Sequence, residues 1–205
     1  MSRHSLEKDA GDELESRVCE APRVGRDIII VRDFLNHRVD VRLMDELGDL
    51  MAWQWENYRI DYVLTAPSSG ICPAYATALH LDKIVPVIYA KDSTSAVVRD
   101  SEVYHTEVLS ATRGTTRTFT VVRELLPPGS KVLIVDDFLA CGNAALGLAQ
   151  IVRDAQCELV GIQVVIEKPW QNGRETILKQ FPEAEIHSLC CADPVSHETS
   201  DNQNN

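Results

Sequence analysis

Apolar runs of strand length alternate with amphipathic stretches of helix length through the middle of the chain. Apolar residues at helical spacing predict helices at residues 43–51, 71–81 and 144–154. Five compact apolar runs predict strands at residues 27–31, 62–66, 84–89, 132–135 and 159–166. The last run has β-branched residues on both faces, which predicts a central strand. This alternation is typical of an α/β domain with a parallel sheet.

The segment from residue 91 to residue 123 breaks the alternation. It lacks a clear apolar period and is crowded with Thr, Ser and charged residues. This composition predicts either a long mobile loop or an excursion of β-structure away from the sheet. Loops of that length inside a compact domain are usually functional.

The two ends of the chain differ in character from its middle. Residues 1–24 are charged, aperiodic and poor in large apolar groups, and residues 193–205 are mostly polar. We therefore expect a disordered acidic N-terminal tail over 1–24, one domain over 25–192 and a disordered C-terminal tail over 193–205. The sequence contains no internal repeat and no second apolar core.

Composition and charge narrow the classes of partner. The chain has 205 residues, of which 44% are hydrophobic and 25% charged, as in an ordinary globular domain. Its 20 basic and 31 acidic residues give a formal net charge of −11. DNA, RNA and anionic membranes select positive surfaces, so we expect no nucleic-acid or membrane partner. A small basic pocket within an acidic surface remains compatible with this charge.

The cysteines and the N-terminal segment bear on the compartment. The N-terminus is polar and does not have the pattern of a signal peptide. No apolar run reaches the roughly 18 residues that a bilayer-spanning helix needs. The six cysteines form neither a C-x-x-C pair nor a Cys/His cluster at zinc spacing. We therefore expect reduced thiols and a cytoplasmic protein.

The most informative stretch is V-L-I-V-D-D-F-L-A-C-G-N-A-A, at residues 132–145. An apolar strand ends in Asp136 and Asp137, and a turn of small residues around Gly142 leads into a helix. Amides of such a turn and helix N-terminus bind phosphate, while carboxylates at a strand end bind ribose hydroxyls or a magnesium-bridged sugar. Ligands of open parallel sheets bind at this edge. The two Asp residues could instead form a capping device or a generic metal site.

This block resembles the signature with which the type I phosphoribosyltransferases bind phosphoribosyl pyrophosphate (PRPP). The resemblance is most specific for the xanthine phosphoribosyltransferases of the purine branch. Matching segments follow in the family's order: D-F-L-N-H, S-S-G-I, V-P-V, D-D-F-L-A-x-G-x-A and V-I-E-K-x-x-Q-x-G-R, at residues 33–37, 68–71, 85–87, 136–144 and 165–174. It implies the α/β fold of that family, a parallel sheet with helices on both faces and a small hood.

The resemblance also implies roles for individual residues. The catalytic pair Asp136 and Asp137 would hold the ribose hydroxyls. The 5′-phosphate would be wrapped by Ala140, Cys141, Gly142, Asn143 and Ala144. Pyrophosphate would be received by Ser68, Ser69, Gly70 and Lys91. The purine would be bound by Ile29, Asn36 and Lys168, with Phe138 or Trp170 as a stacking face.

Several of these residues have plain structural alternatives. Trp170 could be an ordinary core residue, and Lys168 could be a solvated lysine at a strand end. Arg113 and Arg117 lie in the segment 91–123, which in this family would close over the substrate and exclude water. These two arginines could equally be loose surface charges.

The resemblance implies a glycosyltransferase, a pentosyltransferase that moves the ribosyl 5-phosphate of PRPP to xanthine and releases xanthosine 5′-monophosphate (XMP) and pyrophosphate. The reaction needs no covalent nucleophile, so the enzyme positions the reactants and stabilises the departing pyrophosphate. Mg²⁺ would be held mainly through PRPP, without direct protein ligands. Ala140 replaces the acidic base of hypoxanthine-guanine relatives, which suits a readily ionised base, and Lys168 would favour the xanthine anion.

Two other functions compete with this one. The same fold could prefer guanine or hypoxanthine, or the chain could be a catalytically weak PRPP-binding regulator. Regulators of this fold carry a basic surface and an N-terminal DNA-binding domain, for which the acidic extension here is too short.

The sequence departs from the family's pattern at Pro67, Cys141 and Asn143, and only Lys91 remains of a basic run after the third strand. The resemblance further implies a homodimer.

Overall fold

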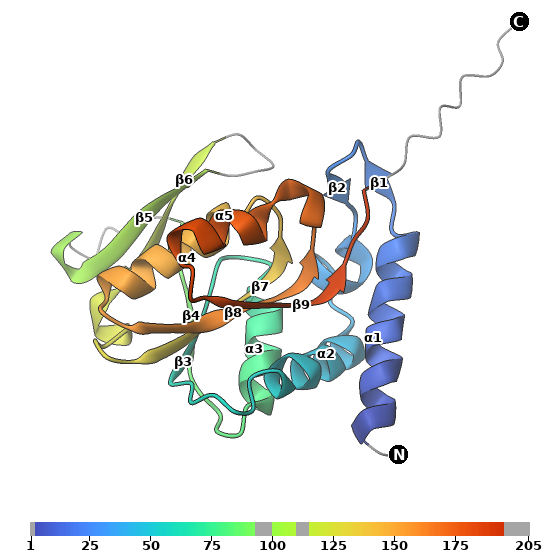
Figure 1. Cartoon of the computed structure of the whole chain (residues 1–205), viewed down its shortest axis with the longest axis horizontal. Helices are drawn as coiled ribbons and strands as arrows, with labels where there is room; N and C mark the ends of the chain where they lie inside the picture. The colour runs from blue at the N-terminus through green and yellow to red at the C-terminus, as the bar shows by residue number, and fades with distance from the viewer. Residues whose placement is uncertain (1–2, 93–99, 110–114, 195–205) are drawn as a thin grey trace, which may run out of the picture.

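A computed structural model describes residues 3–92, 100–109 and 115–194 (Figure 1). At its centre lies a five-stranded parallel sheet in the order β4-β3-β7-β8-β9. The strands span Tyr62–Thr65 (β3), Val87–Tyr89 (β4), Lys131–Leu139 (β7), Glu158–Glu167 (β8) and Glu185–Cys191 (β9). The predicted parallel α/β fold is therefore confirmed.

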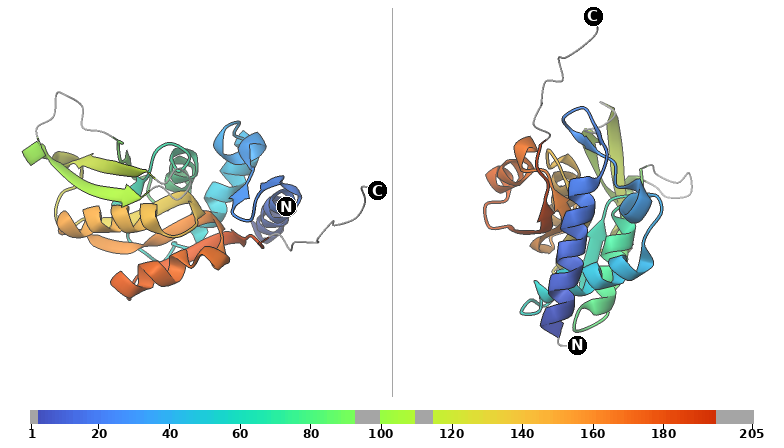
Figure 2. Two further views of the ribbon diagram at one scale, coloured as in Figure 1. Left: turned by 90° about the horizontal axis from the view of Figure 1, so that it is seen from above. Right: turned by 90° about the vertical axis from the view of Figure 1, so that its right-hand side faces the viewer.

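Helices cover both faces of the sheet (Figures 1 and 2). Helices α2 (Val41–Trp53) and α3 (Ile71–His80) lie on one face. Helices α4 (Asn143–Asp154) and α5 (Gly173–Gln180) lie on the other. Side chains of β7 over residues 132–135 enter the two cores in turn, because successive residues of a strand point to opposite faces.

Strand β9 and helix α5 were not predicted from the sequence. Both mix polar and apolar residues over a short span, so neither shows a clean period. Strand β9 occupies the edge of the sheet, where the surroundings do not demand a continuous apolar run. Strand β8 has a neighbour on each side, in line with its apolar pattern, while β7 is the middle strand.

The apolar run at 27–31 does not join the main sheet as a strand. Only Ile28–Ile29 (β2) is extended, and it pairs with Arg23–Val24 (β1) in a two-stranded antiparallel sheet. One turn of π-helix follows at Arg32–Asn36. These elements form the small hood, and hydrogen bonds join it to the carboxyl ends of β7 and β8. The apolar run is needed there to cover the core rather than to extend the sheet.

Between β4 and β7 the chain forms an antiparallel ribbon of β5 (Val103–Leu109) and β6 (Thr116–Val122). Of the two structures predicted for 91–123, the described residues adopt the excursion of β-structure. The ribbon packs beside α4, with Val108 and Phe119 buried in the same core (Figure 2). Short 3-10 turns lie at Asp100–Glu102, Arg123–Leu125 and Pro169–Gln171.

The N-terminal segment forms a helix, α1 (Arg3–Glu20), so the prediction of a disordered tail over 1–24 is wrong. Leu14 is 0% exposed, and together with Val18 it packs into the core shared by α2 and α3. The apolar stripe of α1 is narrow and lies among charged residues, so the sequence pattern of the segment does not indicate a helix with a buried face.

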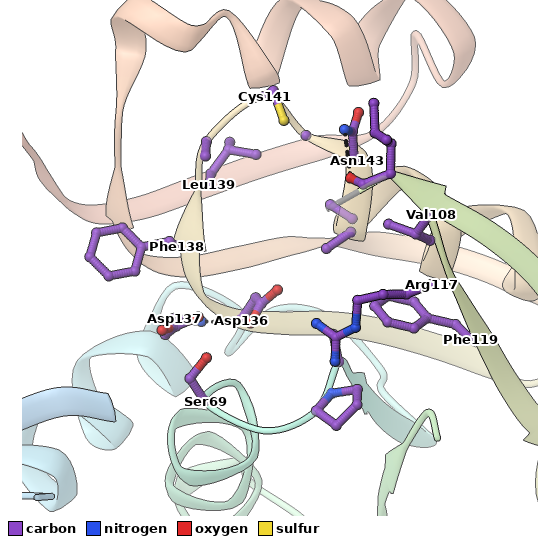
Figure 3. Close-up of a pocket in the computed structure, with 17 residues that line it drawn as sticks. Ser69, Val108, Arg117, Phe119, Asp136, Asp137, Phe138, Leu139, Cys141 and Asn143 are labelled. Carbon is purple, nitrogen blue, oxygen red and sulfur yellow. Dashed lines mark hydrogen bonds between the residues drawn. The ribbon is translucent and has the colours of Figure 1, made fainter. Parts of the chain in front are cut away.

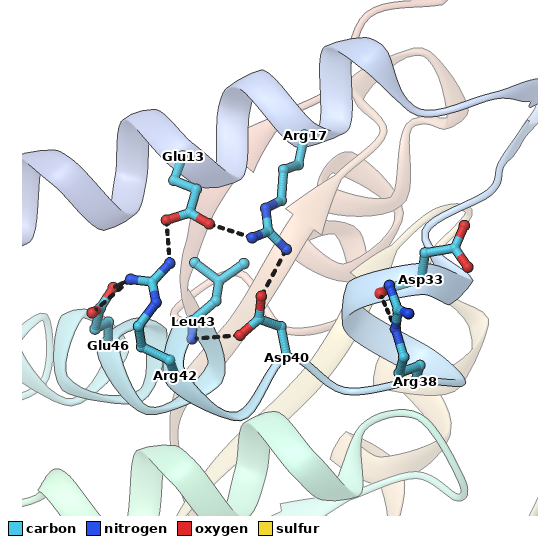
Figure 4. Close-up of polar contacts among 8 residues, drawn as sticks. All are labelled: Glu13, Arg17, Asp33, Arg38, Asp40, Arg42, Leu43 and Glu46. Carbon is cyan, nitrogen blue, oxygen red and sulfur yellow. Dashed lines mark hydrogen bonds and ion pairs between the residues drawn. The ribbon is translucent and has the colours of Figure 1, made fainter.

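Ion pairs hold α1 against the start of α2 (Figure 4). Arg17 pairs with Asp40 at 2.9 Å and Arg42 pairs with Glu13 at 2.6 Å, while Arg17 also pairs with Glu13 within α1 at 2.5 Å. Asp40 also caps α2, because its side chain accepts a hydrogen bond from the amide of Leu43 at 3.3 Å. The hydrogen bond from Arg42 lowers the pKa of Glu13, and the one from the Leu43 amide lowers the pKa of Asp40.

Most of the predicted C-terminal tail lies outside the described residues, which end at residue 194. Arg113 lies outside them as well. The single domain over 25–192 stays a prediction, now with α1 packed against its core. Within the described parts of the chain, no helix is long and apolar enough to cross a membrane.

Candidate active site

A cavity of about 220 Å³ opens beside the carboxyl end of β7, between the sheet, the ribbon and the start of α4 (Figure 3). It is also lined by the loop that joins β3 to α3. The predicted site residues in the lining are Ser69, Asp136, Asp137, Phe138, Ala140, Cys141, Gly142, Asn143 and Ala144. The structure thus brings the carboxylate pair, the small-residue turn and part of the loop after β3 to one cavity.

Asp136 and Asp137 lie within β7, which continues to Leu139 instead of ending before the carboxylates. Each Asp is 7% exposed, and Asp136 Oδ1 accepts a hydrogen bond from the Asp137 amide at 2.9 Å. Burial, followed by the charge of Asp137, raises the pKa of Asp136 well above its usual range. Asn36 of the hood donates from Nδ2 to Asp137 Oδ2 at 3.4 Å. A buried carboxylate pair of this kind is typical of a functional site.

The chain leaves β7 through Ala140 and Cys141 and enters α4 at Asn143. Gly142 between them has φ +85°, a left-handed conformation that favours glycine. The first turn of a helix leaves amides without intrahelical partners, so this turn offers N–H donors to an anion. Asn143 donates from Nδ2 to the carbonyl oxygen of Leu109 at 2.9 Å, which ties the turn to the ribbon (Figure 3).

The loop after β3 approaches the carboxylates from below in the same view (Figure 3). Ser69 lines the cavity, whereas Ser68 and Gly70 are not among its described lining residues. A Cβ on Gly70 would lie 2.5 Å from Asp136 Oδ1, so a larger residue does not fit there. The peptide bond between Pro67 and Ser68 is cis.

Lys168 lies where the hood meets the end of β8. Its Nζ donates to the carbonyl oxygen of Asp27 at 2.7 Å and lies 4.8 Å from the ring centre of Phe138. Lys168 is 9% exposed, so it is not a solvated lysine at a strand end. Burial lowers the pKa of Lys168, although the charges of Asp27 and Asp137 oppose the shift.

Five other predicted residues are not among the described residues that line the cavity. Asn36 and Lys168 reach it only through Asp137 and the ring of Phe138, and the other three are Trp170, Ile29 and Lys91. Trp170 is half-buried against the core and donates from Nε1 to Asp27 Oδ1 at 3.0 Å. Of the two predicted stacking residues, Phe138 lines the cavity, together with Phe119 of the ribbon. Ile29 belongs to β2 of the hood, and its side chain is buried in the core. Lys91 pairs through its main chain with β6, and its side chain is exposed.

Among the residues that shape the site, sequence reasoning missed Asp27, Gly173 and Phe119, and it left Arg117 open. Asp27 accepts hydrogen bonds from Lys168 and Trp170 only because the hood folds back onto β8, so no local signal marks it. Gly173 touches the turn around Gly142, and its signal was its place in the block at 165–174. Arg117 lines the cavity, so it is not a loose surface charge.

The carboxylate pair also bears on metal binding. Within the described residues, no three His, Cys, Asp or Glu side chains gather in a way that could hold a metal ion. Asp136 and Asp137 offer hard oxygen ligands, and Mg²⁺ in proteins commonly binds one or two carboxylates together with substrate phosphates. These residues therefore fit a magnesium ion that is held mainly by a phosphorylated ligand.

A glycine turn at a helix N-terminus, beside buried carboxylates at the carboxyl edge of a parallel sheet, defines an α/β protein with a site for a sugar phosphate. Residues 41–187 match the phosphoribosyl transferase domain family. The chain is 42% identical over 168 residues to the xanthine phosphoribosyltransferase of Lactococcus lactis, covering 82% of this chain and 84% of the relative. It is 45% identical over 150 residues to that of Laribacter hongkongensis, covering 73% and 78%. The chain belongs to the phosphoribosyltransferase family, in the group of the xanthine phosphoribosyltransferases.

Solved structures share the fold at lower sequence identity. The adenine phosphoribosyltransferase of Rhodothermus marinus has a TM-score of 0.69 at 20% identity, over 90% of this chain and 99% of that one. The enzyme of the same name from Leishmania donovani has a TM-score of 0.71 at 16% identity, over 96% and 86%. At these identities the likeness shows the fold alone.

Proposed function

We propose that this chain is a purine salvage enzyme that transfers the ribosyl 5-phosphate of PRPP to xanthine, giving XMP and pyrophosphate. The proposal rests on the family to which the chain belongs and on one observation of the site. The buried Lys168 stands at the ring of Phe138, next along β7 to the carboxylate pair. A base bound at that ring lies beside a ribose bound at Asp136 and Asp137.

Positioning accounts for most of the chemistry in this proposal. The amides of residues 140–144 hold the 5′-phosphate, Asp136 and Asp137 hold the ribose hydroxyls, and the loop at 68–70 receives the pyrophosphate. Holding the sugar phosphate at both ends presents the anomeric carbon to the base. The bond from that carbon to the purine nitrogen forms as its bond to pyrophosphate breaks, without a covalent intermediate on the enzyme.

Lys168 supplies the preference for xanthine in this proposal. Xanthine ionises more readily than guanine or hypoxanthine, and a buried ammonium stabilises its anion. One of the three N–H donors of Lys168 goes to the carbonyl oxygen of Asp27 at 2.7 Å, which leaves two for the base. Ala140 offers no proton acceptor in the turn, so a base that arrives as an anion has the advantage.

The cofactor in this proposal is Mg²⁺, held mainly through PRPP. Asp136 and Asp137 are the carboxylates of the described lining, and they would face the ribose and the ion. When bound, the ion neutralises charge on the departing pyrophosphate. The chain's own contribution is to hold the ribose hydroxyls at a fixed place beneath the hood.

We also propose a cytoplasmic homodimer. Val41, Tyr75 and Leu79 are 76%, 60% and 41% exposed on an apolar groove along α2 and α3, and such patches mark interaction surfaces. The second copy is the occupant that the family resemblance implies. All six cysteines are free, which suits a reducing compartment. Sedimentation of the wild type and of Tyr75→Glu tests the dimer: we expect a dimer and a monomer, and a monomeric wild type would contradict it.

The activity is tested by following pyrophosphate release from PRPP and magnesium with xanthine, guanine, hypoxanthine or adenine. We expect the highest kcat/KM with xanthine. A higher kcat/KM with guanine or hypoxanthine would show that the preferred substrate is that purine and not xanthine. Binding of PRPP without release of pyrophosphate for any of the four bases would leave a PRPP-binding regulator.

A further inference from the structure

Arg117 of β6 is the one basic side chain among the described residues that line the cavity. The same lining carries Asp136 and Asp137, so its formal charge is negative. Figure 3 shows the guanidinium reaching from the ribbon across the cavity, toward Asp136 and the loop that carries Ser69. Carboxylates alone repel a ligand with a diphosphate group, so this cation favours the binding of such a group here.

Arg117 is itself held by a carboxylate from the sheet side of the cavity. Its Nη2 forms an ion pair with Asp92 Oδ2. Asp92 follows β4, and β4 is the neighbour of β3, whose own loop carries Ser69. The guanidinium is therefore anchored where β3 and β4 end, rather than at the turn of residues 140–144.

The ion pair is of a kind that a phosphorylated ligand displaces. The side chains of Arg117 and Asp92 are 33% and 47% exposed, and water screens pairs of that exposure strongly. A planar guanidinium makes short, charge-assisted and often bidentate hydrogen bonds to phosphate oxygens. The guanidinium carbon also lies 5.8 Å from the ring centre of Phe119, a support that does not depend on Asp92.

We propose that Arg117 binds the pyrophosphate group of PRPP, and that Asp92 holds Arg117 over the cavity until that group takes its place. Arg117 is the binding residue, and Asp92 is a positioning residue that competes with the ligand. The inference rests on the proposed function, because PRPP is the ligand. It assigns the positive charge at this end of the cavity to the ribbon, whereas the exposed side chain of Lys91 stands outside the lining.

Calorimetric titration of the full chain with magnesium, using inorganic pyrophosphate, PRPP and ribose 5-phosphate as probes, tests the role of Arg117. The variant Arg117→Gln is expected to weaken binding of pyrophosphate and PRPP by about tenfold or more. Binding of ribose 5-phosphate stays unchanged, because that probe lacks the diphosphate. Arg117→Lys keeps the charge without the fork and recovers part of the affinity.

The role of Asp92 is tested by a change of the opposite sign. Asp92→Asn frees the guanidinium and is expected to tighten pyrophosphate binding by about twofold to fivefold. The KM for PRPP falls with it, while kcat changes little. In the Arg117→Gln background the same substitution has no effect, because Asp92 acts through Arg117. Weaker binding in Asp92→Asn, or an equal gain in both backgrounds, would overturn the role of Asp92.

Arg123→Gln is the matched control. Arg123 follows the same ribbon, lies 4.2 Å from the ring centre of Tyr104 and stands outside the described lining, so this variant removes the same charge away from the cavity. An equal loss of pyrophosphate affinity in both Gln variants, or none in Arg117→Gln, would overturn the inference. A wild type that binds pyrophosphate but not PRPP would instead overturn the proposed function.

Discussion

Gly142 and Gly173 meet backbone to backbone beneath the turn that follows β7. A Cβ on Gly142 would lie 2.9 Å from the carbonyl oxygen of Gly173, and a Cβ on Gly173 would lie 2.1 Å from the carbonyl oxygen of Ala140. Neither position has room for a side chain. The first residue of α5 therefore sets the position of the turn that we assign to the 5′-phosphate.

Gly173→Ala is expected to displace this turn and to weaken ribose 5-phosphate binding by about tenfold to a hundredfold, since small misplacements of a binding group are costly. Gly11→Ala is the control, because apart from its chain neighbours and the backbone of its own helix no atom lies within 4 Å of a Cβ placed there. Titration with ribose 5-phosphate measures the effect. Wild-type affinity in Gly173→Ala would show that α5 does not set the position of the turn.

A second pair separates contact from backbone strain. Gly142 and Gly129 have φ +85° and +82°, but nothing lies within 4 Å of a Cβ on Gly129. Alanine at either position is strained by the same backbone conformation. Only Gly142→Ala is expected to lose ribose 5-phosphate binding, and equal losses in the two variants would contradict a specific role for the turn.

Lys168→Met is expected to lower kcat/KM for xanthine by about tenfold or more without raising the KM for PRPP, because it removes a buried ammonium from the base. The pH dependence of kcat/KM gives a second test, because its direction follows from the pKa of Lys168. Burial lowers the pKa of Lys168, and the ammonium is present only below that pKa. kcat/KM for xanthine should therefore fall, as pH rises, at a lower pH than an ordinary lysine allows.

Lys168→Arg provides the control for this profile. Its guanidinium stays charged throughout the alkaline range, so the fall at high pH should vanish even where the rate itself is reduced. Steady-state rates with xanthine at saturating PRPP measure both variants. An alkaline limb that is identical in Lys168→Arg and the wild type would assign the titration to another group.

Asp136→Asn is expected to stabilise the folded protein while weakening PRPP binding. The pKa of Asp136 is higher in the folded state than in the unfolded state. The free energy of unfolding therefore decreases as pH rises from the unfolded pKa through the folded one. Asparagine removes the buried charge and keeps an oxygen for the Asp137 amide, which donates at 2.9 Å. We expect the free energy of unfolding near pH 7 to rise by about 1 kcal/mol.

Urea unfolding across a pH series measures this gain, which should shrink toward zero once acid protonates Asp136 in both states. The exposed Asp33→Asn is the matched control and should change the free energy of unfolding by less than about 0.5 kcal/mol. A gain that is constant with pH would separate the stabilisation from the ionisation of Asp136.

Leu14→Ala is expected to lower the free energy of unfolding by about 2–4 kcal/mol, because it opens a cavity under α1. Leu14 is fully buried, whereas Ser16 is exposed on the same helix, so Ser16→Ala should cost less than about 0.5 kcal/mol. The pKa values of Glu13 and Asp40 are lowered in the folded protein. The packing of α1 against α2 is therefore expected to weaken as pH falls through these values. Equal unfolding midpoints for the two variants would mean that α1 does not pack on the core.

Much of the fold follows from local pattern. The strand at 62–66 and the helices at 71–81 and 144–154 were predicted near their observed bounds, because buried strands and one-sided helices each leave a period in the sequence. The strand at 132–135 was predicted too short, since β7 continues to Leu139. Helix α1 was not predicted, because its apolar stripe is narrow. The run at 27–31 misled because an apolar segment can cover a core without joining a sheet.

The carboxylate pair and the turn into α4 were predictable because they form one continuous stretch, in which strand, turn and helix follow within a few residues. By itself, the sequence determined the layers of the sheet and this one edge of the site, since period and turn geometry act over short distances. Only the tertiary structure decided that Asp27 meets Lys168, that Gly173 supports Gly142 and that Arg117 faces the carboxylates. Those contacts join distant segments, and they depend on how the two cores pack the hood, α5 and the ribbon around the sheet.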